Sequence, residues 1–385
     1  MLTRHGIVVV AAGIAAVVVG RVFAVVELFV IGAAFVGAAV AAVGYVRLRF
    51  PPVQADRWVH PSVLVAGDTG RVDLQLRHRG HLRSATFVLA ESVRRPSGDQ
   101  HVARLPMAPM PRGVRTSTGY QLPTTRRGVV TLGPLAIEMS DPLGVARRSR
   151  PVVGIDEVTV APRVHLLEMP QLGQGELGKA LLAKAQRLGP GEFHGLREYA
   201  DGDEPRTIHW KASARTEALM VREYSIEGLH RCTVVFDAAR RAHADAEAFE
   251  RGVTAAASLV HSAARAGLTT RFVSSEGVDL RGPDVVSNTL RVLARIEPAD
   301  DPPGAIERET GDGLGLVIVV TGSAREPAWG NARTSIDPTF TALLVATGDA
   351  GPPGAALSVA ATSDEDFVRS WQSLCGRGRL DLVAT

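Results

Sequence analysis

The sequence predicts a multidomain membrane protein with an N-terminal transmembrane helical hairpin, an antiparallel β-sandwich and a C-terminal α/β domain built on a parallel sheet. Three patterns predict this order: a nearly continuous apolar run, then short alternating segments, then buried strands that alternate with helical periods. We place the hairpin in residues 1–50, the β domain in 51–165, a linker and polar motif in 166–229, and the α/β domain in 230–385. A chain of 385 residues is long enough for two soluble domains and an anchor.

The composition is that of a folded protein with no nucleic-acid surface. The chain is 45% hydrophobic and 22% charged, with a formal net charge of only +3. The basic residues are almost all arginine, and no basic run reaches the five to eight residues of a nucleic-acid patch. Cys232 and Cys375 are too few for a disulfide framework and fit a reducing compartment.

Residues 6–46 are apolar except for Arg21 and Glu27. A single span needs about 20 apolar residues, so this run predicts two spans, at about 6–23 and 27–46. A cleaved signal peptide has a shorter apolar core of about 7–15 residues, with no second apolar block behind it. We therefore expect a retained hairpin.

The charges that flank the two spans predict their orientation. Arg4 precedes the first span, and Arg47 and Arg49 follow the second, whereas the connecting turn carries one arginine and one glutamate. Because positive residues favour the cytoplasmic side, we expect both ends of the hairpin and all the soluble domains in the cytoplasm.

The β domain is indicated by alternating runs such as Val72–Leu76 and Val129–Leu132, which are separated by turn signals such as Pro96–Asp99. Several short strands with no helical period favour an antiparallel sandwich of immunoglobulin-like type. His78 and His81 lie close in sequence, but they have no neighbouring cluster of metal ligands. We expect them to be solvated surface residues.

Residues 173–180 nearly match the phosphate-binding pattern G-x-x-x-x-G-K-[ST]. Ala180 replaces the hydroxyl that binds magnesium in a true P-loop, and residues 165–170 make a poor feeding strand. We expect a flexible linker that leads into a short helix around Leu177–Gln186.

Residues 191–227 combine many ionisable groups with aromatic residues. One hypothesis is a hydrolase with His209 as base, Asp203 or Glu204 as its orienter and Ser213 as nucleophile. The nucleophile-elbow pattern G-x-S-x-G is absent from this stretch, as are HExxH and any cysteine pair.

The alternative that we favour is a network of ion pairs that braces a turn for structure or docking. It would join Arg197, Arg206 and Arg215 to Glu198, Asp201 and Asp203, with Gly202 in the turn. Trp210 would pack its ring. We therefore assign no catalytic residue.

The C-terminal region alternates strands and helices, which predicts a parallel sheet covered on both faces. The expected strands are 232–237, 269–273, 316–321 and 341–346, and the expected helices are 244–266, 285–296 and 364–375. Asp237 ends the first strand, and ligands bind at that edge of open α/β sheets.

The stretch from Gly195 to Arg215 resembles the signature of the family catalogued as domain of unknown function 58. The shared positions are Arg197, Glu198, Tyr199, Gly202, Asp203, Arg206, His209, Trp210, Ser213 and Arg215. The blocks TRRG (125–128), LGP (132–134) and DPLG (141–144) and the hairpin also resemble this family. The resemblance implies a von Willebrand factor A-like C-terminal domain, no established enzymatic activity, and a MoxR-type AAA ATPase as partner.

A von Willebrand A domain places the metal-binding pattern D-x-S-x-S at the end of its first strand. Here the positions read Asp237 to Arg241 with both serines lost, and a later strand ends in Thr321 followed by glycine. Hard cations need several oxygen ligands, so Asp237 and Thr321 form a degenerate site where we expect no metal. We expect Arg240 or Arg241 to pair with Asp237 instead.

The leading hypothesis is a non-enzymatic, membrane-anchored adaptor for a MoxR-type ATPase, with no cofactor, nucleic acid or small-molecule substrate. The rival is the hydrolase described above, and a weaker third possibility is an envelope assembly factor that acts through the β domain.

Overall fold

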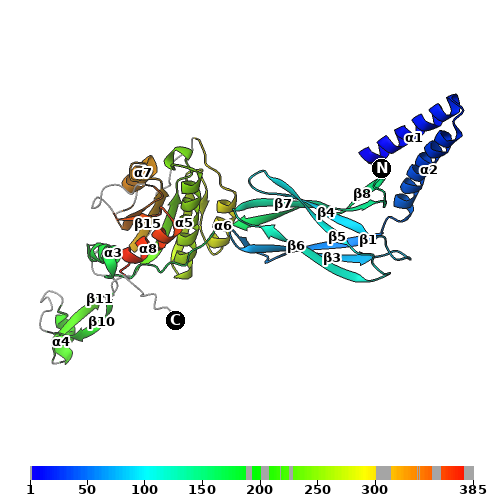
Figure 1. Ribbon diagram of the computed structural model, residues 1–385. Coiled ribbons are helices and arrows are strands. Elements are labelled where there is room, and N and C mark those ends of the chain that lie inside the picture. The colour runs from blue at the N-terminus through cyan, green and yellow to red at the C-terminus, as the bar shows by residue number, and fades with distance from the viewer. Residues whose placement is uncertain are drawn as a thin grey trace, which may run out of the picture. The chain divides into compact units, whose positions relative to one another are not determined.

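The computed structural model describes residues 2–187, 193–200, 208–216, 218–224, 229–300, 314–335, 337, 339–348 and 357–376. The chain divides into two compact units, Met1–Ala161 and Pro162–Thr385 (Figure 1).

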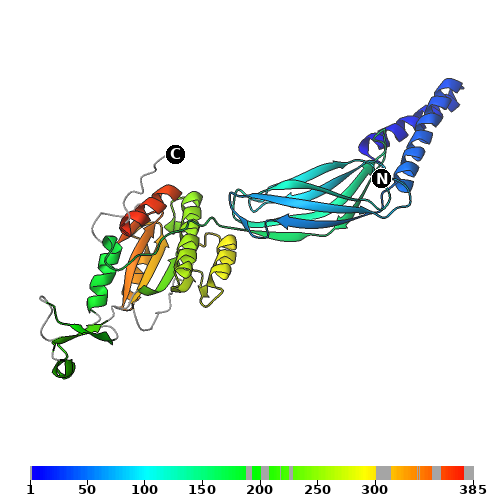
Figure 2. The ribbon, with the colours of Figure 1, turned by 90° about the horizontal axis from the view of Figure 1, so that it is seen from below.

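The first unit begins with two apolar helices, α1 (Arg4–Val22) and α2 (Val26–Leu48), which are long and apolar enough to cross a membrane. They run side by side, and a Cβ on Gly32 would lie 2.6 Å from the carbonyl oxygen of Gly13 (Figures 1 and 2). This close approach requires glycine. The expected helical hairpin is confirmed.

The start of α1 is fastened to a turn of the β domain. Thr3 Oγ1 accepts a hydrogen bond from the Gly6 amide at 3.0 Å and donates to the carbonyl oxygen of Gly144 at 2.6 Å. The Thr3 amide donates to the carbonyl oxygen of Val145 at 2.9 Å. The same threonine therefore caps the helix and joins it to the DPLG turn.

The β domain consists of two sheets around one core (Figure 2). One sheet has the order β1-β3-β6, the other β2-β9-β7-β4-β5 with β8 beside β7, and all pairs are antiparallel except β2–β9. The strands are β1 (Val53–His60), β2 (Leu64–Val65), β3 (Thr69–His78), β4 (Phe87–Arg94), β5 (Gln100–Met107), β6 (Arg115–Pro123), β7 (Gly128–Ser140), β8 (Arg147–Val153) and β9 (Asp156–Ala161). Leu74 of one sheet and Leu89 and Ile137 of the other belong to the shared core. The predicted β domain is confirmed.

The expectation for His78 is wrong. Its exposed fraction is 2%, because β3 alternates and His78 falls in the inward register of Leu74 and Leu76. His81, in the turn that follows, is exposed as expected.

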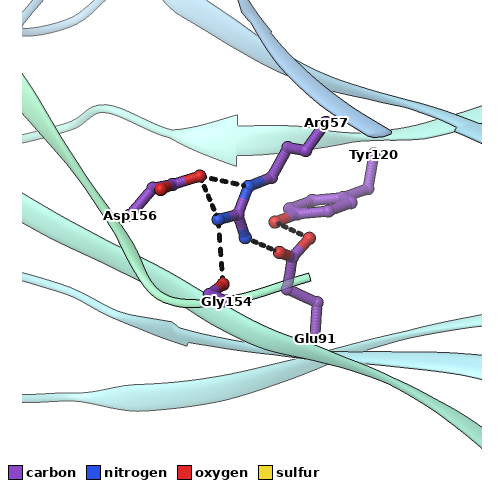
Figure 3. Close-up of polar contacts among 5 residues, drawn as sticks. All are labelled: Arg57, Glu91, Tyr120, Gly154 and Asp156. Carbon is purple, nitrogen blue, oxygen red and sulfur yellow. Dashed lines mark hydrogen bonds and ion pairs between the residues drawn. The ribbon is translucent and has the colours of Figure 1, made fainter. Parts of the chain in front are cut away.

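A buried ion-pair network joins the two sheets (Figure 3). Arg57 of β1 forms an ion pair with Glu91 of β4, and their side chains are 2% and 1% exposed. The same guanidinium pairs with Asp156 of β9 and donates to the carbonyl oxygen of Gly154 at 3.1 Å. The hydroxyl of Tyr120 on β6 donates to Glu91 Oε2 at 2.9 Å.

The protonation states of this network follow from burial and charge. Burial, then the charge of Glu91 and the hydrogen bond to it, raise the pKa of the Tyr120 phenol, so it remains a donor. Burial acts to lower the pKa of Arg57, but the hydrogen bonds and charges of Asp156 and Glu91 outweigh it and raise that pKa. The arginine therefore keeps its charge.

Gly133, the glycine of the LGP block, leaves room for this network. Its φ is +103°, and a Cβ there would lie 2.4 Å from the carbonyl oxygen of Gly154 and 3.2 Å from the Arg57 guanidinium. A side chain at this position would displace one of the acceptors of Arg57.

The second unit is an α/β domain whose mixed sheet has the order β14-β13-β12-β15-β16-β17, parallel except for β14. Its strands are β12 (Leu229–Phe236), β13 (Thr269–Ser274), β14 (Asp279–Leu280), β15 (Leu314–Thr321), β16 (Phe340–Ala346) and β17 (Ser358–Ala360). Its helices include α3 (Gly175–Arg187), α5 (Ala246–Arg265), α6 (Val285–Arg295), α7 (Pro327–Ser335) and α8 (Asp364–Leu374). Helices α3, α5, α6 and α8 share a core with one face of the sheet, and α7 packs on the other.

Residues 162–187 are part of this unit, so the expectation of a flexible linker is wrong. The Leu167 amide donates to Ser262 Oγ at 3.0 Å, and the indole N–H of Trp371 donates to the carbonyl oxygen of Glu168 at 2.8 Å. Leu177 and Leu181 of α3 are fully buried in the core. The predicted helix itself is confirmed.

The glycines that imitate a P-loop serve packing. Gly175 has φ +62°, and a Cβ there would lie 2.3 Å from the Gly376 amide nitrogen. A Cβ on Gly178 would lie 2.1 Å from the carbonyl oxygen of Gln171. The backbone atoms that contact these glycines therefore account for them.

We expect Glu91→Ala to lower the free energy of unfolding of the first unit by about 3–5 kcal/mol, because it leaves the buried Arg57 charge without one partner. Native-state hydrogen exchange of β1 and β4 peptides in the full-length chain measures the change. Glu138→Ala is the matched control, since Glu138 pairs with the half-exposed Arg104 and Arg147. That variant should lose about 1 kcal/mol at most, and equal losses in both variants would contradict the role of the network.

Candidate functional site

The motif shared with the family folds partly as a small strand–helix–strand module (Figure 1). Strands β10 (Phe193–Glu198) and β11 (Met220–Tyr224) pair antiparallel, and helix α4 (Trp210–Thr216) lies between them in sequence. Ile208 forms an isolated bridge to Val221 of β11. Gly202, Asp203 and Arg206 lie outside the described residues.

His209 and Ser213 hold α4 against β11. The His209 amide donates to the carbonyl oxygen of Met220 at 2.7 Å, and its Nδ1 accepts from the Ala212 amide at 3.0 Å. Ser213 Oγ accepts from the Met220 amide at 2.8 Å and donates to the carbonyl oxygen of His209 at 3.2 Å. Backbone groups thus bond the Ser213 hydroxyl and His209 Nδ1, whereas Asp203 and Glu204 of the hydrolase hypothesis lie outside the described residues.

This geometry gives the serine a structural role. A nucleophilic serine donates its proton to the ring of its base. Here Ser213 donates to the backbone of His209, whose Nδ1 accepts from a backbone amide. The described contacts of this pair brace α4 against β11.

The remaining motif residues lie on the surface of the module. Arg197, Glu198 and Arg215 are exposed, and Arg197 donates to the carbonyl oxygen of Glu198 at 3.1 Å. Tyr199 is half-buried, and its amide donates to the carbonyl oxygen of Leu219 at 2.8 Å.

Trp210 is 65% exposed, so the expectation that its ring packs is wrong. Ala212 and Ser213 of α4 are half-buried, and Ser213 is bonded to Met220 of β11, whereas Trp210 at the first helical position is exposed. Leu196 and Leu219 are also exposed. The module thus presents three large apolar side chains.

The second candidate site is at the carboxyl edge of the α/β sheet. Numbered along the chain, the six strands have the order 3-2-1-4-5-6, so the order reverses between β12 and β15. Ligands bind at this switch point in open α/β sheets. Asp237 follows β12, and Thr321 ends β15.

Asp237 is 4% exposed, and its carboxylate is bonded by the protein itself. Oδ2 accepts from the hydroxyl of Thr321 at 2.8 Å, and Oδ1 accepts from the Ala239 amide at 3.1 Å. The structure therefore brings together the two residues of the degenerate metal site. In the described part of the chain, no group of three or more His, Cys, Asp or Glu side chains is placed to hold a metal.

We expected Arg240 or Arg241 to form an ion pair with Asp237, and this expectation is wrong. The Arg240 guanidinium pairs with Asp300 at 2.6 Å and donates to the carbonyl oxygen of Pro298 at 3.0 Å. Arg240 and Arg241 are exposed, whereas Asp237 is buried. Backbone and hydroxyl donors, which are available inside the fold, take the place of the expected guanidinium.

His243 and Thr347 complete this polar cluster, and sequence reasoning missed both. His243 Nε2 lies 2.7 Å from the carbonyl oxygen of Asp237, and Nδ1 lies 3.1 Å from Thr347 Oγ1. A carbonyl only accepts, so Nε2 carries the proton and the Thr347 hydroxyl donates to Nδ1. Neither residue belongs to a local motif, because the contact spans 104 positions.

Burial lowers the pKa of His243, although the hydrogen bond to the Asp237 carbonyl and the charges of Asp237 and Glu326 oppose it. The imidazole is therefore neutral in the folded protein at neutral pH. The cluster as a whole can orient a carboxylate and hold a neutral imidazole in one tautomer.

We expect acid to destabilise the second unit through His243. Its stabilising effect is complete above the ordinary histidine pKa of about 6.5 and is lost as pH falls from there toward the lowered folded-state pKa, since the unfolded chain binds the proton more readily. The midpoint of urea unfolding should be lower at about pH 5.5 than at about pH 7.5, because these two values lie on either side of the ordinary histidine pKa. The fluorescence of the buried Trp329 and Trp371 reports the unfolding. His243→Gln should reduce this fall, and His230→Gln, at an exposed position, should leave it unchanged. An identical fall in His243→Gln would refute the assignment.

Three solved structures illustrate distant similarities to parts of the chain. The CARDB domain of a Pyrococcus furiosus protein in complex with di-metal ions is 10% identical over 29% of this chain and 94% of that one, with a TM-score of 0.22. Alkylpurine DNA glycosylase AlkC from Pseudomonas fluorescens, bound to DNA containing an abasic site analog, is 13% identical over 35% and 38%, with a TM-score of 0.21. Beta-glucosidase 3B from Thermotoga neapolitana, in complex with alpha-D-glucose, is 13% identical over 29% and 17%, with a TM-score of 0.19. These scores are too low to support an inference about fold or function.

No curated protein matches the chain. A family model described as "Protein of unknown function DUF58" matches residues 195–317. The matched segment contains the module from Gly195 to Arg215 and Asp237 at the switch point. This match supports the DUF58 family for this part of the chain.

Proposed function

We propose that the protein is a membrane-anchored, non-enzymatic adaptor that docks a MoxR-type AAA ATPase during assembly or maturation of a partner complex or of the cell envelope. In this proposal α1 and α2 span the membrane, and both chain termini and the soluble units are cytoplasmic. The carboxyl-terminal unit is a von Willebrand factor A-like domain, and the β domain is immunoglobulin-like.

Anchoring is supported by the two long apolar helices and by the arginines beside them. Arg4 at the start of α1 and Arg47 near the end of α2 are exposed. The start of α1 is bonded to the DPLG turn of the β domain, so these helix ends lie on the same side as that domain. Positive residues on that side favour a cytoplasmic location.

A von Willebrand A-like identity is supported by the 3-2-1-4-5-6 strand order and by the acidic residue that follows the first strand. Asp237 is bonded by Thr321 and Ala239, and alanine stands where the first serine of the metal-binding pattern would be. Because the Asp237 carboxylate is already hydrogen-bonded within the protein, this edge of the sheet offers few oxygens to a cation. It is better suited to presenting a surface to another protein.

The observation that carries the proposal is the exposure of Trp210, with Leu196 and Leu219, on a module whose histidine and serine are bonded to its backbone. Tryptophan is enriched among the residues that dominate binding energy at protein interfaces. The resemblance to the family indicates a MoxR-type ATPase as the protein that covers these side chains.

We expect affinity purification of the full-length chain from detergent-solubilised membranes to recover an AAA ATPase. Trp210→Ala should reduce this recovery at least about tenfold, as removal of an interface hot spot costs about 2 kcal/mol or more. Leu166→Ala is the matched control, because Leu166 is 63% exposed but lies outside the module. Failure of the unmodified chain to recover an ATPase would contradict the proposed partner, and equal recovery by both variants would contradict the proposed docking surface.

A further inference from the structure

One end of the β-sandwich adjoins the membrane hairpin. Strand β1 begins at Val53, shortly after α2 ends, and Val53 pairs with His78 at the end of β3. The Arg79 amide donates to the carbonyl oxygen of Pro52 at 2.9 Å. The turn at 79–86 therefore lies at the hairpin end of the sandwich.

Two further turns lie at the same end. The Gly113 amide donates to the carbonyl oxygen of His78 at 3.2 Å, which places the turn at 108–114 beside the end of β3. The turn at 141–146 accepts the two hydrogen bonds from Thr3 that fasten the start of α1. We call the three turns 79–86, 108–114 and 141–146 the hairpin-end turns.

The hairpin-end turns share one chemistry, which is an exposed apolar side chain with arginines nearby. The exposed apolar residues are Leu82, Val114 and Leu143. The exposed arginines in or next to these turns are Arg79, Arg83, Arg112, Arg115 and Arg147, of which Arg147 pairs with Glu138. Such a mixture suits a bilayer interface, where apolar groups enter the acyl boundary and cations meet phosphates.

Asp141 is the only acidic residue in the sequence of these three turns. It is 5% exposed, and its carboxylate accepts from the amides of Leu143 at 2.8 Å and Ala146 at 2.5 Å. It therefore shapes the turn and adds little negative charge to the surface. The opposite end of the sandwich also exposes apolar residues, such as Ile155, and arginines, such as Arg94 and Arg126, but its turns carry the exposed Asp68 and Asp99 as well. The hairpin-end turns differ because their one acidic residue is buried.

We propose that the hairpin-end turns bind the anionic phospholipid headgroups of the bilayer that α1 and α2 span. The arginines pair with headgroup phosphates, and Leu82 and Leu143 enter the headgroup region. An arginine close to an anionic membrane surface gains about 1 kcal/mol, roughly a fivefold preference. This proposal rests on the membrane anchoring proposed above. It goes beyond it because it specifies which end of the β domain contacts the bilayer surface.

The test uses the full-length chain carrying Leu82→Cys, labelled with an environment-sensitive fluorophore and reconstituted into vesicles. Cys232 and Cys375 are buried, so the label should attach at the new thiol. Emission should shift to the blue in vesicles that contain phosphatidylglycerol, relative to vesicles of phosphatidylcholine alone. NaCl at about 1 M, where the screening length is about 3 Å, should reverse the shift.

Two matched controls keep the result specific. Ile155→Cys places the label on a residue that is 63% exposed, similar to the 72% of Leu82, but at the opposite end, where no shift should occur. Adding Arg83→Gln and Arg112→Gln to the Leu82 label should raise the phosphatidylglycerol fraction needed for half of the shift. Arg94→Gln with Arg126→Gln makes the same charge change at exposed positions of the opposite end and should leave that fraction unchanged.

Failure of the two proposals can be distinguished in the same vesicles. If alkaline carbonate releases the unmodified chain, membrane anchoring fails and the headgroup proposal fails with it. If the chain resists carbonate but the label at position 82 shows the same emission in both lipids, only the headgroup proposal is overturned. An equal blue shift in phosphatidylcholine would also overturn it, because contact would then depend on apolarity alone.

Discussion

A hydrogen bond of 2.8 Å joins the Thr321 hydroxyl to Asp237 Oδ2 at the carboxyl edge of the α/β sheet. It joins the ends of β12 and β15 at the point where the strand order reverses. A buried carboxylate is costly unless donors satisfy it, and here a threonine hydroxyl and a backbone amide do so. The carbonyl of the same aspartate fixes the tautomer of His243, which in turn accepts from Thr347. Asp237 thus bonds Thr321, Ala239 and His243 directly and is connected to Thr347 through His243.

The same physical device recurs in the β unit. Arg57 and Glu91 are almost fully buried and connect the two sheets, and Gly133 leaves the space that their partners need. In both units the buried charged groups, Asp237 in one and Arg57 with Glu91 in the other, are bonded to partners within the fold. Outside α1 and α2, exposed apolar side chains occur in the module around Trp210 and in the hairpin-end turns, and also at Trp58, Val63, Val102, Ile155 and Leu166.

The sequence predicted elements well where an apolar run continued over many residues, as in both apolar helices and in buried strands such as Leu314–Thr321. It failed where contacts join distant residues. Residues 166–187 read as a linker because the Ser262 hydroxyl that bonds the Leu167 amide lies 95 positions away on α5. Asp237 and Thr321 were found because each ends a strand, whereas His243 and Thr347 carry no such local signal. The exposure of Trp210 depends on which side of the seven-residue helix α4 meets β11, and a helix that short shows no clear period.

The proposed adaptor function requires that the module around Trp210 contact an AAA ATPase in the cell. Site-specific photo-crosslinking tests it most directly, with a benzophenone amino acid in place of Leu219 in the full-length chain and, as control, in place of Leu166. Mass spectrometry should identify a MoxR-type ATPase joined to position 219 and not to position 166. Crosslinks from position 219 that contain no ATPase, or the same products from both positions, would contradict an adaptor that docks through this module.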